Sequence, residues 1–146
     1  MGLFSLTQDI AVDLGTANTI IIYKGKIVVD QPSIIAMNVM TQKVEAIGHA
    51  AALMEGKAPK HIQTIRPLRD GVIADFQAAE LMIRGMVKMI SAKSHVMTPS
   101  LRMVVGIPSG ATEVERRAVR DSAEHAGGRE VFLIDEPMAA ALGFGL

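Results

Sequence analysis

A short polar segment near the amino terminus has the side chains and the backbone to bind phosphate. Asp13–Thr19 has the sequence DLGTANT and ends an apolar, β-branched run that we expect to form a strand. Glycine lets a turn fold tightly, so that several amide N–H groups point toward one anion, and Thr16, Asn18 and Thr19 add side-chain donors. The Asp13 carboxylate, costly to bury without a positive partner, suits a hydrated Mg²⁺ beside the phosphates. A plain hairpin with a polar tip would explain the same residues without a ligand.

Two other kinds of nucleotide site are excluded by the sequence around this turn. A second β-branched run, Thr19–Tyr23, follows it where a dinucleotide-binding turn would lead into a helix. The pattern G-x-x-x-x-G-K-[ST] does not occur, so the chain has no P-loop.

A second group with possible chemistry follows the last predicted strand. Leu101–Ile107 and Val131–Ile134 are apolar runs that we expect to form strands buried on both faces, and Glu136 lies in the first turn of the helix after the second run. Ligands of open α/β sheets bind where the strands end, and a carboxylate there can orient water for attack on a terminal phosphate. Asp135 and Glu136 are equally suited to cap the helix, and both roles hold if Asp135 caps while Glu136 faces the site.

The elements that must position these groups alternate between strands and helices. A hairpin turn is predicted at Lys24-Gly25, and Asp75 and the pair Thr112 and Glu115 are predicted to begin helices. The predicted strands are Asp9–Gly15, Thr19–Tyr23, Ile27–Val29, Ser33–Val39, Lys43–Ile47, Leu101–Ile107 and Val131–Ile134, with extended chain in Thr64–Ala74 and helices in His49–Glu55, Phe76–Ala92, Glu113–Ala126 and from Glu136 on. This order predicts an α/β fold with a mixed sheet.

Composition sets wider limits on function. The 146 residues, 49% of them hydrophobic, fit one domain with a substantial core. Basic and acidic residues balance at 15 each, and we expect no nucleic-acid partner. The sequence has no cysteine and only scattered histidines, so neither disulfides nor a structural zinc site is expected. It has no spanning apolar run or secretory signal, which predicts a cytoplasmic protein.

Four segments together resemble the MreB family of bacterial actin-like proteins and, more distantly, actin and the heat-shock chaperone ATPases. They are DLGTANT, IRPLRDGVIADF (65–76), PSGATEVERRAVRDSAEHAG (108–127) and LIDEPMAAALG (133–143). The resemblance implies an actin-like, ribonuclease H-like domain: a mixed sheet flanked by helices, with a small inserted α+β subdomain. Residues 1–31 and 70–146 would form the discontinuous subdomain IA, and residues 32–69 the inserted subdomain IB. The chain would be the N-terminal half of such a protein, with the second ATP-binding half absent.

The resemblance also implies ATP and Mg²⁺ as ligands and a role for each matching residue. Asp13 would hold Mg²⁺ through water, and Glu136 would position the hydrolytic water. The phosphates of ATP would be contacted by Gly15, Thr16, Ala17 and Asn18. A slow ATPase is implied for the complete protein, and none is expected of this half alone.

The family's partners would be further copies of the protein, the membrane and the cell-wall synthesis machinery. Subunits would join head to tail and in antiparallel filament pairs, peripheral on the inner face of the cytoplasmic membrane. Leu3 and Phe4 at the terminus, and Val96 and Met97 beside basic residues, are weak interfacial signals that ordinary packing would explain equally well. The resemblance favours membrane contact for all four.

Val114 is a candidate contact between paired filaments. A helical step of 100° per residue places Ala118, Val119, Ala123 and Ala126 on one face of the helix 113–126 and Val114 at its rim. A single apolar residue in that position often has no role, but in the resembling family this helix joins the two filaments.

Two other functions remain consistent with the sequence. The chain could belong to an ATPase of the chaperone branch, or it could be an interaction module that binds no nucleotide and uses the helix 113–126.

Overall fold

A computed structural model of the chain describes residues 7–93 and 100–143, with residues 91–93 and 140–143 described by their backbone alone. Leu3, Phe4, Val96 and Met97, the predicted membrane contacts, lie outside the described residues.

The largest element is a five-stranded sheet in the order β10-β9-β1-β2-β3. Its first three strands in sequence, β1 (Thr7–Leu14), β2 (Asn18–Tyr23) and β3 (Lys26–Pro32), form an antiparallel meander. The turn between β2 and β3 has Lys24 and Gly25 at positive φ, as the predicted hairpin requires. The later strands, β9 (Ser100–Ile107) and β10 (Gly128–Asp135), add on the other side of β1 and run parallel to it. The predicted mixed sheet is therefore confirmed.

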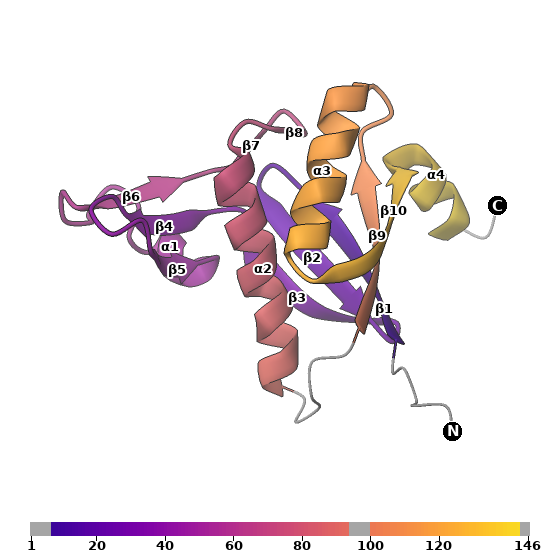
Figure 1. Ribbon diagram of the computed structural model, residues 1–146, viewed down its shortest axis with the longest axis horizontal. Helices are drawn as coiled ribbons and strands as arrows, with labels where there is room; N and C mark the ends of the chain where they lie inside the picture. Colours follow the sequence, from indigo (N-terminus) through magenta and orange to yellow (C-terminus); the bar gives the residue numbers. More distant parts are fainter. Residues whose placement is uncertain (1–6, 94–99, 144–146) are drawn as a thin grey trace.

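Two helices cover one face of this sheet (Figure 1). In α2 (Phe76–Lys93), Asp75 Oδ1 accepts a hydrogen bond from the Ala78 amide at 3.0 Å, which confirms the predicted cap. The capping box of Thr112 and Glu115 is also present at the start of α3 (Glu113–His125). The fully buried side chains between helices and sheet include Ile21, Met82, Ile83, Met86, Met103 and Val105.

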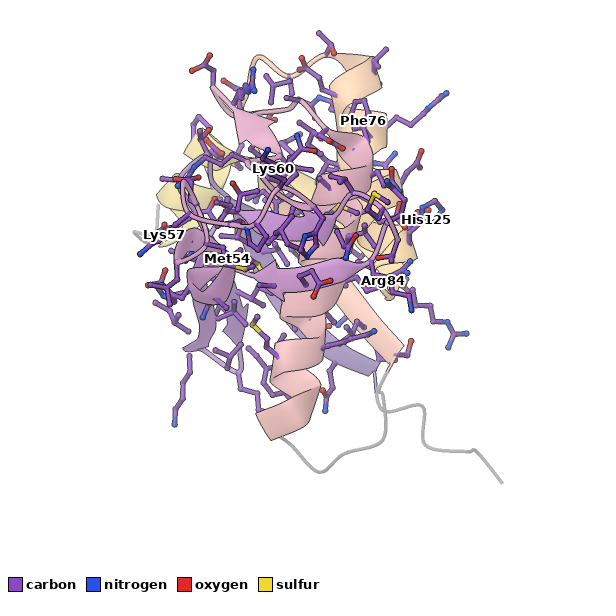
Figure 2. The ribbon with its side chains drawn as sticks, turned by 90° about the vertical axis from the view of Figure 1, so that its left-hand side faces the viewer. Met54, Lys57, Lys60, Phe76, Arg84 and His125 are labelled. Carbon is purple, nitrogen blue, oxygen red and sulfur yellow. The ribbon has the colours of Figure 1, made fainter. Side chains whose placement is uncertain are left out.

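The last turn of α3 is joined to the middle of α2 by a polar contact. Arg84 donates from one nitrogen to Glu80 at 3.1 Å and to the backbone carbonyl of His125 at 2.8 Å, and the His125 ring lies 3.0 Å from the second Glu80 oxygen. Figure 2 shows Arg84 and His125 on the same side of the molecule. The contact holds the last turn of α3 against α2.

The opposite face of the sheet is open, contrary to the prediction that the last two strands are buried on both faces. Along β9 the side chains alternate between buried and exposed, and Val104 is 37% exposed. On the edge strand β10, Phe132 is 52% exposed. The physical reason is that α2 and α3 pack on the same side, while α4 (Glu136–Gly143) comes near the other side only where the parallel strands end.

A separate small sheet lies within the range predicted for the inserted subdomain, 32–69. It has the order β5-β4-β6 and carries one short helix, with Ile34, Ala36 and Ala51 buried together. Its elements are β4 (Ile35–Asn38), β5 (Val44–Ile47), α1 (His49–Ala52) and β6 (Ile62–Ile65). It lies to the left of α2 in Figure 1 and faces the viewer in Figure 2, with Met54, Lys57 and Lys60.

The small sheet is followed by a short hairpin that leads into α2. It consists of β7 (Leu68–Arg69) and β8 (Val72–Ile73), joined by Asp70 and Gly71 at positive φ. The hairpin lies in the segment predicted to be extended.

Candidate functional site

The connection between β1 and β2 forms a tight turn with unpaired amides. The Gly15 amide donates to the Asn18 carbonyl at 3.0 Å. A Cβ atom at position 15 would lie 2.4 Å from that same carbonyl oxygen, so the turn accepts only glycine here. The amides of Thr16 and Ala17 have no hydrogen-bond acceptor among the described residues, and both residues are exposed. Adjacent unpaired amides of this kind suit an anion.

Two neighbouring segments support the turn. The Gly71 amide, in the β7–β8 hairpin, donates to Thr16 Oγ1 at 2.9 Å, so the hydroxyl proton of Thr16 remains available for a ligand. Thr19, in contrast, is fully buried and its hydroxyl lies 2.8 Å from Ser33 Oγ. The prediction that Thr19 supplies a donor to the site is therefore wrong, because its side chain points into the body of the domain.

Asp13 and Glu136 lie on the same hollow at the open face of the sheet. The strand register places Asp13 beside Gly106 of β9, and Gly106 beside Ile134 of β10, two residues before Glu136. The hollow has a volume of about 630 Å³, and its other lining residues are mostly apolar, among them Ala11, Ile22, Val104 and Ala139. Parallel strands that end together thus bring the two carboxylates to one place, although they come from opposite ends of the sequence.

Gly106 lies on β9, between the strand that carries Asp13 and the strand that precedes Glu136. A Cβ atom there would lie 3.8 Å from Glu136 Cγ, so the Glu136 side chain extends over the glycine. Gly106 is not among the site residues predicted from the sequence. A glycine inside an otherwise apolar strand is nevertheless a signal of close approach by another group.

The carboxylates at this edge differ from one another in their partners. Asp13 is exposed rather than buried, because its side chain points to the open face of the sheet. The Asp135 carboxylate accepts a hydrogen bond from Arg116 of α3 at 2.9 Å. Among the described residues neither Asp13 nor Glu136 has an ion pair, and no cluster of three possible metal ligands occurs. A single carboxylate fits a Mg²⁺ ion that keeps most of its water.

Val114 is more exposed than we expect for a residue at the rim of a buried helix face. Its side chain is 74% exposed, because the buried side of α3 consists of Val119, Ser122 and Ala123. Val114 borders a hollow of about 520 Å³ that three arginines of α3 also line.

In the described part of the chain, no helix combines the length and apolar character needed to cross a membrane.

The sheet order, the two helices on one face and the turn between the first two strands define an actin-like fold. The solved structure of the MamK double helical filament has this fold, with a TM-score of 0.77 at 18% identity over 95% of this chain and 44% of that one. A closer similarity comes from MreB5 of Spiroplasma citri bound to ADP, with a TM-score of 0.80 at 34% identity over 97% of this chain and 42% of that chain.

The chain belongs to the MreB/Mbl protein family, whose family model matches residues 7–146. It is 51% identical to the cell shape-determining protein MreB of Escherichia coli (strain K12) over 99% of this chain and 42% of that protein. It is 43% identical to the cell shape-determining protein Mbl of Bacillus subtilis (strain 168), over 95% of this chain and 41% of that protein. The chain thus spans less than half the length of these relatives.

Proposed function

We propose that this chain is the phosphate-binding part of an actin-like cytoskeletal protein that binds Mg·ATP, forms filaments and governs cell shape. The observation that carries the proposal is that Asp13 and Glu136 line one hollow at the edge of the sheet, while the unpaired amide turn directly follows the strand that carries Asp13. MreB5 of Spiroplasma citri, a member of the same family by name, has been solved with both ADP and AMPPNP. Membership of the MreB/Mbl family also favours a filament subunit over an ATPase of the chaperone branch.

Each site residue has a role in this proposal. Asp13 holds a hydrated Mg²⁺, whose charge offsets that of the phosphates. The backbone from Gly15 to Asn18 binds the phosphate oxygens, with the Thr16 hydroxyl as a further donor. Glu136 positions the water that attacks the terminal phosphate, which requires orientation more than a strong base, so slow hydrolysis is expected.

The proposal is tested on the full-length protein with calorimetry, sedimentation and electron microscopy. We expect Mg·ATP to bind and filaments to form with nucleotide and not without it. An absence of binding would contradict the nucleotide role and favour an interaction module instead. Binding without assembly at any protein concentration would contradict the filament role.

Gly15→Ala is expected to weaken Mg·ATP binding about five- to a hundredfold and to lower the melting temperature. The new methyl group would meet a backbone carbonyl, which cannot move without opening the turn, and strain of this kind costs about 1–3 kcal/mol. Gly110→Ala is a matched control, because a Cβ at position 110 has nothing within 4 Å. Equal affinities for the two variants would show that the shape of the turn does not matter for binding.

We also propose that the assembled protein contacts the membrane, where the cell-wall synthesis machinery works, through Leu3, Phe4, Val96 and Met97. Replacing both Leu3 and Phe4 with serine is expected to reduce co-sedimentation with anionic liposomes and to leave assembly in solution intact. Each large apolar side chain contributes roughly 1.5–3 kcal/mol on burial, and a filament repeats the contact many times.

The control for this membrane prediction replaces Met40 and Leu53 with serine. These apolar side chains lie in the small-sheet region and are 80% and 71% exposed. Equal loss of liposome binding in both double variants would show that exposed apolar area in general, and not the terminus, attaches the protein.

A further inference from the structure

Ser33 is a fully buried residue that contacts the phosphate-binding turn at two points and Thr19 of β2 at a third. Its Oγ donates to the Gly15 carbonyl at 2.7 Å, and its amide donates to the Ala17 carbonyl at 2.8 Å. Its Oγ also lies 2.8 Å from Thr19 Oγ1. Ser33 directly follows β3, so the chain makes these contacts as it leaves the meander for the small sheet.

The direction of the two hydroxyl bonds follows from the number of protons. The Gly15 carbonyl can only accept, so the single hydroxyl proton of Ser33 is used there. The Thr19 hydroxyl must then donate to Ser33 Oγ. Thr19, Ser33 and Gly15 therefore form a directed chain, in which both hydroxyl groups are 0% exposed.

These bonds determine which way the turn's amides point. A trans peptide unit is planar, so its C=O and the following N–H point in opposite directions, and no peptide bond in the described residues is cis. Ser33 holds the carbonyls of Gly15 and Ala17 on its own side. The N–H groups of the next residues, Thr16 and Asn18, must then point away from the Ser33 atoms that hold these two carbonyls.

We propose that Ser33 is a positioning residue that keeps the turn in its anion-binding shape. The inference rests on the proposed Mg·ATP binding, but it adds a residue that does not itself touch the ligand. Its hydroxyl acts through the Gly15 carbonyl, while its amide bond to Ala17 is independent of the side chain. The side chain can therefore be changed without removing the whole support.

Three variants of the full-length protein separate positioning from simple hydrogen-bond satisfaction: Ser33→Ala, Thr19→Val and the double variant. Mg·ATP affinity is measured by calorimetry and stability by urea unfolding. Thr19→Val keeps the bond from Ser33 to Gly15, so its affinity should stay within about twofold of the original. Ser33→Ala frees the Gly15 carbonyl, and its affinity should fall about three- to tenfold.

The double variant gives the decisive result. Ser33→Ala alone leaves the buried Thr19 hydroxyl without its acceptor and should lower the urea midpoint, whereas removing both hydroxyls should restore much of that loss. The affinity of the double variant should nevertheless stay as low as that of Ser33→Ala, because the Gly15 carbonyl is still free. This comparison remains informative even if Ser33→Ala folds poorly.

Two outcomes would overturn the inference, and they can be told apart. If Mg·ATP affinity recovers together with stability in the double variant, Ser33 has only a structural role. The proposed binding of Mg·ATP would still stand in that case. If the original protein does not bind Mg·ATP, the proposed function fails and the role of Ser33 fails with it.

Discussion

Val114→Glu is expected to eliminate paired filaments while leaving a folded subunit that binds Mg·ATP. The side chain is 74% exposed, so the new carboxylate stays hydrated in the free subunit, where it can also pair with Arg117 one turn along the helix. In an antiparallel pair with two-fold symmetry the same surface of each copy meets at the axis. Two new carboxylates would then face each other and lose water, and like charges in an interface cost several kcal/mol.

Electron microscopy of assembled protein decides this prediction. Single filaments should remain, since head-to-tail contacts use other surfaces. Val114→Thr is the control, because it keeps the size and branching of valine without adding charge, and it should still give pairs. Normal pairs from the glutamate variant would remove α3 from the filament-pair contact. An unfolded glutamate variant would contradict the exposure of Val114.

Asp13→Ala is expected to weaken Mg·ATP binding about ten- to a hundredfold with little change in stability. The effect is large because a charged hydrogen-bonding group is lost from the ion's surroundings, and such bonds are worth about 1.5–3 kcal/mol. Stability should hardly change because Asp13 is exposed and has no ion pair among the described residues. Removing Mg²⁺ with a chelator should lower the affinity of the original protein and have much less effect on the variant.

Asp9→Ala is a closely matched control for Asp13→Ala. Asp9 lies on the same strand and face, four residues earlier, and forms a two-bond ion pair with Arg102. The hydrogen bond from Arg102 lowers the pKa of the Asp9 carboxyl below its ordinary value. Removing the Asp9 carboxylate should not alter Mg·ATP affinity. Equal effects from both aspartates would indicate a general influence of negative charge, and an unchanged affinity for Asp13→Ala would remove the Mg²⁺ assignment.

The sequence was sufficient for features that depend on near neighbours. Asp75 and Thr112 carry their helix caps within three residues, and the Lys24-Gly25 turn needs only its own backbone preference. The shared location of Asp13 and Glu136 also follows from sequence, once the strands before them are taken as parallel and ending at one edge.

The features that sequence analysis missed depend on distant parts of the chain. Gly71 reaches Thr16 across 55 positions, and Ser33 reaches Gly15 across 18, so no local pattern marks either residue. The wrong prediction that β9 and β10 are buried on both faces has a similar origin. Apolar runs such as Leu101–Ile107 show that a strand is hydrophobic, but they do not show on which side the helices pack.

The pairing of β1 with β9 has a consequence for the order in which the protein is made. Asp9 pairs with Arg102, 93 positions later, whereas β1 and β2 meet within one hairpin. At about 5–20 residues per second, a ribosome needs roughly 5–20 seconds to add the intervening chain. The hairpin with its unpaired amides can close early, but one edge of β1 has to wait for β9, and Glu136 is made last. During that interval the nascent chain presents an unpaired strand edge, the feature most prone to mispairing with other chains.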